Sequence, residues 1–188
     1  MKTIKYSSII FLSAFLMLSF SAGPENMENE SPEEEKKSEI QWMSFKEAID
    51  LENTDKKYFI YVYTDWCGWC TRLKNTTFQD EKVIRLLNEE FIPVSFNGES
   101  KKTVNFKGQE FKYVENGPRG VHQLSMALLN NRPSYPSLVF LDEEMNMIQP
   151  LPGYKSAEDL SIILTFLSDE IYEEMTFEDY YKQQTQGG

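Results

Sequence analysis

The chain contains two cysteines, Cys67 and Cys70, and only the dipeptide Gly68-Trp69 separates them. This spacing places two sulfur atoms close together at the start of an expected helix, where the helix dipole favours a negatively charged thiolate. A thiolate can attack a disulfide, and a neighbouring thiol can then displace it from the mixed disulfide that forms. The motif therefore predicts reversible disulfide exchange.

A passive structural disulfide is the first alternative for this pair. Such a bond would close a very short loop, so its entropic contribution to stability would be small. The 188 residues contain no further cysteine from which a larger disulfide framework could be built. Reactivity therefore explains the two sulfurs better than stability does.

A metal site is the second alternative. Zinc usually takes four protein ligands in a structural site, whereas this chain has two cysteines and one histidine, His122. The histidine lies far from the cysteines in sequence, on an expected helix, and we interpret it as an ordinary surface or capping residue. We therefore expect neither a metal nor another bound cofactor.

The residues on either side of the pair predict how it is held. The run 58–64 is β-branched or aromatic throughout, which indicates a central strand that is covered on both faces. A helix is expected to begin at the cysteine motif and to continue through Lys74. We expect Trp66 to pack against the site and shield it, and Trp69 to be exposed and to contact a substrate.

The remaining elements follow from capping residues and from apolar periodicity. Further helices are expected at 44–52, 80–90, 118–129 and 156–171. Further strands are expected at 91–96, 137–141 and 147–151, and a small hairpin is expected around Lys107-Gly108. Strands that alternate with helices before a closing hairpin predict an α/β domain, with a mixed central sheet and helices on both of its faces.

The first residues carry the pattern of a secretory signal peptide. Lys2 and Lys5 precede an apolar run at 9–20, and small residues follow at 21–23. We predict a cleaved signal peptide over 1–22 and hence an exported protein of the periplasm or cell envelope. An uncleaved N-terminal anchor is the alternative.

Composition divides the rest of the chain. Residues 23–40 are rich in glutamate and contain no aromatic side chain, which predicts an acidic disordered linker. A single domain at 41–175 and a C-terminal tail at 176–188 follow. The formal net charge of −11 argues against nucleic acid and anionic lipid as partners.

Two motifs together resemble the thioredoxin superfamily. The first runs from Tyr63 through Trp66-Cys67-Gly68-Trp69-Cys70, and the second is Tyr135-Pro136 directly before the strand at 137–141. More narrowly, the chain is similar to exported bacterial thioredoxin-like domains related to the C-terminal domain of the transmembrane thiol transporter DsbD. The similarity covers roughly 44–171 and leaves an insert at 99–131, before Pro136, that thioredoxin itself lacks. The resemblance implies a thioredoxin-like three-layer fold.

The resemblance also assigns roles to residues. It implies that Cys67 is the attacking thiol, that Cys70 is the resolving thiol, and that the two form a disulfide. It further implies that Pro136 follows a cis peptide bond and lies against the sulfurs, and that the backbone of Tyr135 holds a substrate strand. The residues expected to contact substrate are Trp66, Gly68, Trp69, Tyr135 and Pro136.

The chain departs from the superfamily pattern in three places. Tyr61 occupies the position where thioredoxin has a buried acid that moves a proton, and the accompanying lysine has no counterpart near Ser95 or Phe96. The spacer is Gly68-Trp69 rather than Gly-Pro. The proton acceptor and the redox potential are therefore not predicted by the resemblance.

These observations lead to one functional prediction with two alternatives. We predict a protein-disulfide oxidoreductase that works as a reductase on protein thiols and disulfides and receives electrons from a membrane thiol donor. A disulfide oxidase or isomerase is one alternative. A non-catalytic module that binds client proteins on a thioredoxin-like scaffold is the other.

Overall fold

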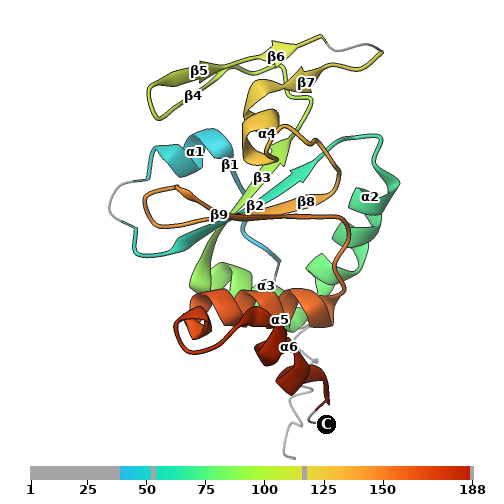
Figure 1. Ribbon diagram of the computed structural model, residues 1–188. Helices are drawn as coiled ribbons and strands as arrows, with labels where there is room; N and C mark the ends of the chain where they lie inside the picture. Colours follow the sequence, from blue (N-terminus) through green and yellow to red (C-terminus); the bar gives the residue numbers. More distant parts are fainter. Residues whose placement is uncertain (1–38, 52–53, 116–117, 187–188) are drawn as a thin grey trace, which may run out of the picture. The chain divides into compact units, whose positions relative to one another are not determined.

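The computed structural model describes residues 39–51, 54–115 and 118–186. The predicted signal peptide and nearly all of the predicted linker lie outside these residues. A five-stranded mixed sheet with the strand order β1-β3-β2-β8-β9 forms the centre of the domain (Figure 1). Its strands are β1 (Met43–Ser44), β2 (Lys57–Tyr63), β3 (Phe91–Asn97), β8 (Ser137–Leu141) and β9 (Met147–Pro152). β1, β3 and β2 run parallel to one another, whereas β8 and β9 pair in the antiparallel sense.

Helices cover both faces of this sheet. They are α1 (Phe45–Ile49), α2 (Gly68–Asn75), α3 (Glu81–Glu90), α4 (Gln123–Leu128), α5 (Ala157–Ser168) and α6 (Phe177–Gln186), with 3-10 turns η1 (Thr77–Gln79) and η2 (Ile171–Glu173). In Figure 1, α3, α5 and α6 lie on one side of the sheet, and α1 and α4 lie on the other. The predicted three-layer α/β architecture is confirmed.

Alternation along β2 explains the two layers. Phe59 and Tyr61 join a core cluster with Leu73 of α2, whereas Tyr58 and Ile60 point into a second cluster on the opposite face. Successive side chains of a strand point to opposite faces, so a strand that is apolar at every position needs cover on both sides. β2 therefore lies at the centre of the sheet, as its composition predicts.

Side-chain caps fix where the flanking helices begin. Ser44 and Glu47 form the predicted capping box at the start of α1. The Asp80 carboxylate accepts hydrogen bonds from the backbone of Lys82 and Val83 at the start of α3, and Ser156 caps α5. Each cap satisfies backbone N–H groups that the first helical turn leaves without partners.

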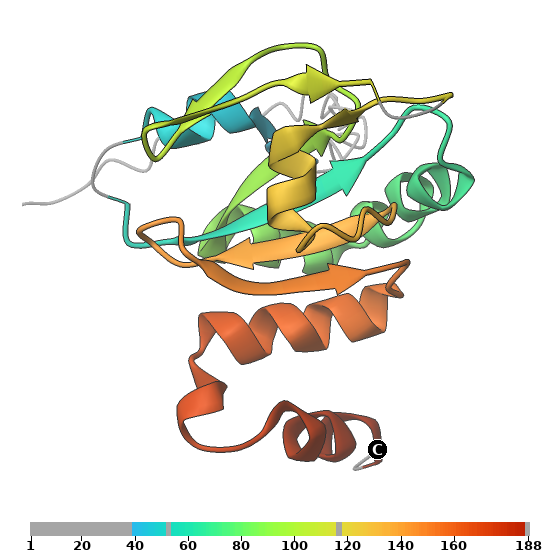
Figure 2. The same cartoon turned by 45° about the horizontal axis from the view of Figure 1, so that its top comes forward.

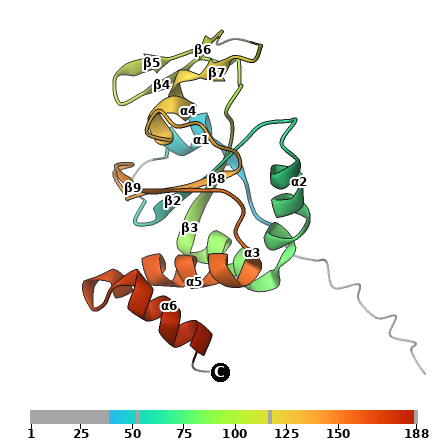
Figure 3. The same cartoon turned by 45° about the vertical axis from the view of Figure 1, so that its right-hand side comes forward.

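The insert at 99–131 builds a second layer over one face of the sheet. It contains the hairpin strands β4 (Val104–Phe106) and β5 (Gln109–Phe111) and a second pair, β6 (Tyr113–Val114) and β7 (Val121–His122), before α4. Lys107 and Gly108 both adopt left-handed conformations in the predicted hairpin turn. Figure 3 shows these strands on the side of the sheet away from α3, α5 and α6.

One prediction within the insert is wrong. The helix expected over 118–129 begins at Gln123, because Val121 and His122 pair with β6 as strand β7. His122 is not on the surface, since none of its side chain is exposed. Its Nδ1 accepts a hydrogen bond from the backbone of Leu124, so the capping role is confirmed and the surface position is not.

Both ends of the described chain belong to the domain. Ile40, which falls in the predicted linker, is buried in the core, and Asn88 holds the adjacent backbone through Glu39 and Gln41. The predicted tail contains α6, whose Tyr180 packs into the same cluster as α5. Figure 2 shows α6 beyond α5, on the side away from β9.

Among the described residues, no helix is both long enough and apolar enough to cross a membrane.

Candidate active site

The two cysteines form a disulfide where β2 gives way to α2. Cys67 is the N-cap of α2, and Cys70 lies one turn into the helix, with 5.2 Å between the two Cα atoms. The backbone N–H of Cys70 donates a hydrogen bond to the Cys67 sulfur over 3.0 Å. The same N–H would stabilise a thiolate at Cys67 after reduction, as would the positive end of the helix dipole.

The burial of the two sulfurs differs only slightly. Cys67 retains 5% of its surface and Cys70 retains 2%, so both cysteines are buried while they form the disulfide. The neighbouring Trp66 and Trp69 are 53% and 56% exposed. The two indole rings are therefore far more open to solvent than the sulfurs are.

The insert provides the surroundings of Trp66. The indole Nε1–H donates to a carboxylate oxygen of Glu99 over 2.9 Å, and the guanidinium of Arg119 lies 4.2 Å from the ring centre. The ring of Tyr135 stands perpendicular to Trp66, with 6.1 Å between the centroids. Trp66 is thus packed against the site as expected, but half of it stays open to solvent.

Tyr135 is fixed by contacts on both sides. Its peptide bond to Pro136 is cis, as the resemblance implies, and Pro136 itself is buried. The hydroxyl of Tyr135 lies 3.2 Å from that of Ser125. Gly98 leaves the room that the Tyr135 ring fills, since a Cβ atom there would stand 2.5 Å from the Tyr135 oxygen. Burial raises the pKa of Tyr135, so its phenol is neutral.

A second aromatic group forms around Trp69, which directly precedes Cys70. Trp69 packs against Tyr154 with 5.7 Å between the ring centroids. The guanidinium of Arg72 lies over both rings, at 5.2 Å from Trp69 and 5.4 Å from Tyr154. The Tyr154 hydroxyl lies 3.2 Å from the hydroxyl of Thr76 at the end of α2. Gly68, between the cysteines, is exposed with no neighbouring atom where a Cβ would be.

Tyr61 occupies the position where thioredoxin has a buried acid. Its hydroxyl donates a hydrogen bond to the backbone oxygen of Cys70 over 3.2 Å. Burial, with a smaller contribution from Tyr63, raises the pKa of Tyr61 far above its usual range. A phenol that keeps its proton cannot accept one from Cys70, so Tyr61 orients the helix backbone and is no substitute for the acid.

The structure therefore unites most of the predicted site and adds to it. Five of the predicted residues form the continuous segment from Trp66 to Cys70, and the ring of Tyr135 contacts this segment through Trp66. Sequence reasoning did not single out the residues that surround the two tryptophans and Tyr135, which are Arg72, Glu99, Arg119 and Ser125. None of these lies in a local motif.

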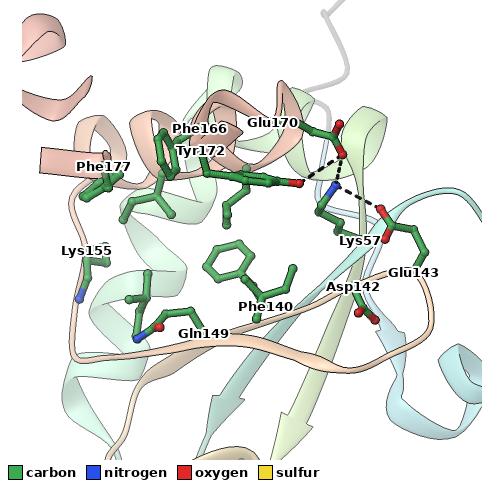
Figure 4. A pocket seen from close by; sticks show the side chains of 14 residues that line it. Lys57, Phe140, Asp142, Glu143, Gln149, Lys155, Phe166, Glu170, Tyr172 and Phe177 are labelled. Atoms are coloured by element: carbon green, nitrogen blue, oxygen red, sulfur yellow. Dashed lines mark hydrogen bonds and ion pairs between the residues drawn. The ribbon is translucent and has the colours of Figure 1, made fainter. Parts of the chain in front are cut away.

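A separate hollow of about 650 Å³ lies between β9, α5, η2 and α6 (Figure 4). Its lining is mostly apolar, with Phe140, Phe166 and Leu167 buried in its floor. Lys57 points into one end of the hollow and pairs there with Glu143 and Glu170. None of the predicted site residues lines this hollow.

The part of the chain that the structure describes contains no group of three or more histidine, cysteine or acidic residues placed to hold a metal ion.

The chain is similar to known proteins in sequence and in fold. A family model described as a thioredoxin-like domain matches residues 45–168. A thioredoxin-fold protein from Helicobacter pylori superposes with a TM-score of 0.55 at 20% identity, over 80% of this chain and 92% of that one. The reduced C-terminal domain of DsbD from Neisseria meningitidis gives a TM-score of 0.38 at 16% identity, over 58% of this chain and 79% of that one.

One curated protein also resembles part of the chain. Mouse Spermatogenesis-associated protein 20 is 34% identical over 68 residues, which is 35% of this chain. The aligned part spans only 9% of the mouse protein.

Proposed function

Because this chain belongs to the thioredoxin-like domain family, we propose that it is a thiol–disulfide oxidoreductase that acts on protein disulfides. The observation that carries the proposal is the Cys67–Cys70 disulfide at the N-terminus of α2, with a backbone N–H aimed at the Cys67 sulfur. The exposed rings of Trp66 and Trp69, which directly precede the two cysteines in sequence, offer a client two contact surfaces.

The proposed reaction is a two-step exchange. The Cys67 thiolate attacks one sulfur of a client disulfide, a mixed disulfide forms, and the other client sulfur leaves as a thiolate that takes a proton from water. Cys70 then loses its proton, its sulfur attacks Cys67, and the second client sulfur leaves. The client gains two electrons and two protons, and the protein is left with the Cys67–Cys70 disulfide.

The net direction is proposed to be reductive. A dithiol donor returns the Cys67–Cys70 disulfide to two thiols, and a membrane thiol transporter is the donor class that the resemblance suggests. Export, proposed from the apolar run at 9–20, would bring the chain to the oxidised clients it reduces. The reverse reactions, oxidation or isomerisation of client thiols, use the same two sulfurs.

A trapping experiment tests the exchange. The reduced Cys70→Ser variant should accumulate a mixed disulfide between Cys67 and a model peptide disulfide, because no second thiol releases the client. Cys67→Ser should form none. If the Cys70→Ser variant traps no peptide and Cys67→Ser binds clients as well as the wild type does, a non-catalytic binding module would be favoured.

The reduction potential of the Cys67–Cys70 pair tests the direction. A value near about −270 mV, as for thioredoxin, supports a reductase, whereas a value near about −120 mV, as for DsbA, supports an oxidase.

A further inference from the structure

We propose that Arg72 and Arg119 make the surface beside the disulfide selective for clients that carry carboxylates next to their cysteines. The inference rests on the proposed exchange function and names the class of client that the site takes. It depends on where the two guanidinium groups lie, on what already binds them, and on the charges around them.

Arg119 comes from the insert and lies against Trp66, directly before Cys67. Its guanidinium is 4.2 Å from the indole centre, a distance at which the ring face attracts a cation. The Arg119 side chain is exposed, and none of the ion pairs among the described residues includes it. The ring therefore orients Arg119 while its charge stays available to a client.

Arg72 lies on α2, two residues after Cys70. Its guanidinium lies over the rings of Trp69 and Tyr154, and its side chain is also exposed. It too is absent from the ion pairs of the described residues. A client bound at Cys67 would thus find one arginine held by Trp66 and a second held by Trp69.

Two carboxylates near Trp66 hold hydrogen bonds to neutral donors. Glu99 accepts the Nε1–H of Trp66, and Asp65 accepts a hydrogen bond from the side chain of Asn97. Neither carboxylate forms an ion pair with Arg72 or Arg119 among the described residues. Each arginine can therefore pair with a client carboxylate, although the formal net charge of the chain is −11.

Guanidinium groups suit this task. Their planar fork donates two parallel hydrogen bonds to one carboxylate, and a stacked arginine loses less freedom when it forms them. Exposed ion pairs are individually weak, at about 0.2–1 kcal/mol, which corresponds to about 1.5- to 5-fold in rate for each arginine. The selectivity should therefore be moderate and should fall as salt is added.

Single-turnover reduction of matched peptides tests the proposal. The reduced full-length chain is mixed with disulfide-linked peptides whose cysteine is flanked by glutamate, glutamine or lysine, and the second-order rate constant is measured for each. We expect the order glutamate, glutamine, lysine at low salt. Arg72→Gln and Arg119→Gln should each reduce the advantage of the glutamate peptide over the lysine peptide about 1.5- to 5-fold.

Arg85→Gln is the matched control. Arg85 is exposed on α3, and its replacement changes the net charge of the chain by the same amount. It should leave the preference unchanged. Equal rates for the three peptides that still require Cys67 would overturn the selectivity and leave the exchange function standing. If Arg85→Gln and Arg119→Gln reduced the advantage of the glutamate peptide equally, the proposed selectivity would also be overturned, since net charge alone would then explain the preference. Failure to reduce any peptide would overturn both proposals.

Discussion

Two regions of this domain could receive another molecule, and they differ in their charges. In the hollow beside α5, the ammonium of Lys57 already has two carboxylate partners, Glu143 at 3.1 Å and Glu170 at 3.0 Å. Beside the disulfide, Arg72 and Arg119 lie on aromatic rings and have no such partners among the described residues. The cation in the hollow is thus already paired, whereas the two cations beside the disulfide are available to a bound molecule. The pockets found in the structure therefore do not identify the region that carries the cysteines.

Substitution of Cys67 should have the largest effect on disulfide exchange, whereas a substitution in the hollow should have almost none. Cys67→Ser removes the attacking sulfur, so the rate of reduction of a peptide disulfide should fall at least about a thousandfold, to the uncatalysed background. Ile148→Thr, in the lining of the hollow, should leave that rate within twofold. Stopped-flow kinetics on both variants measures the contrast. A large loss of rate in Ile148→Thr would show that the regions are coupled.

Lys57→Met should lower the free energy of unfolding and leave the rate of disulfide exchange unchanged. The lysine side chain is 10% exposed and neutralises two carboxylates, so its loss should lower the free energy of unfolding by about 1–2 kcal/mol. Denaturant titration measures this, with the exposed Lys82→Met on α3 as the control. A peptide-reduction rate that falls in proportion to stability would contradict the separation of the two regions.

The pH dependence of the same ion pairs has a definite sign. Burial acts to lower the pKa of Lys57, but the hydrogen bonds that its ammonium donates to Glu170 and Glu143 outweigh this effect and raise the pKa overall. The stabilisation is therefore complete below the unfolded pKa of about 10.4 and is lost as the pH rises through the folded value. Lys57→Met should lose less stability than the wild type when the pH is raised from 9 to 11.

Tyr61→Phe tests whether this tyrosine only positions the helix. Removal of the bond to the Cys70 oxygen should lower the free energy of unfolding by about 0.5–1.5 kcal/mol. The pH profile of exchange should stay unchanged, because a phenol with a raised pKa takes no part in proton transfer. A shift of that profile would show that Tyr61 does move the proton.

The smallest effect is expected from His122 in the insert. Burial lowers the pKa of this histidine, so the neutral ring is favoured in the fold, where Nδ1 accepts from Leu124. The stabilisation is present above the unfolded pKa of about 6.5 and is lost as the pH falls through the folded value. Amide hydrogen exchange in the insert should therefore become severalfold faster relative to the core at low pH. His122→Asn, which keeps a neutral cap acceptor, should not show this change.

The sheet and its helices could be predicted because their signals are local. Continuous apolar runs at 58–63 and 137–141 need cover on both faces, and Ser44, Asp80 and Ser156 stand where a helix needs a cap. The cysteine spacing likewise lies within one turn of one helix. Each of these features depends on residues that are neighbours in the sequence.

The insert could not be predicted in the same way because its contacts are distant in sequence. Val121 and His122 are apolar or weakly polar residues beside a helical pattern, and only their pairing with Tyr113 and Val114 makes them a strand. Arg119 meets Trp66 across more than fifty positions of chain. Such contacts follow from how the insert folds back onto Trp66 and Tyr135, and no local pattern encodes them.

The reactivity of the reduced cysteines at neutral pH tests the proposed chemistry most directly. The reduced full-length chain is treated with iodoacetamide at pH 7, and mass spectrometry follows the alkylation of Cys67 and Cys70 separately. Cys67 should react about tenfold faster than an unstructured cysteine peptide, and Cys70 should react much more slowly, because only Cys67 caps the helix. A Cys67 that reacts no faster than the peptide, or that resists alkylation until the domain unfolds, would contradict its role as the attacking thiol.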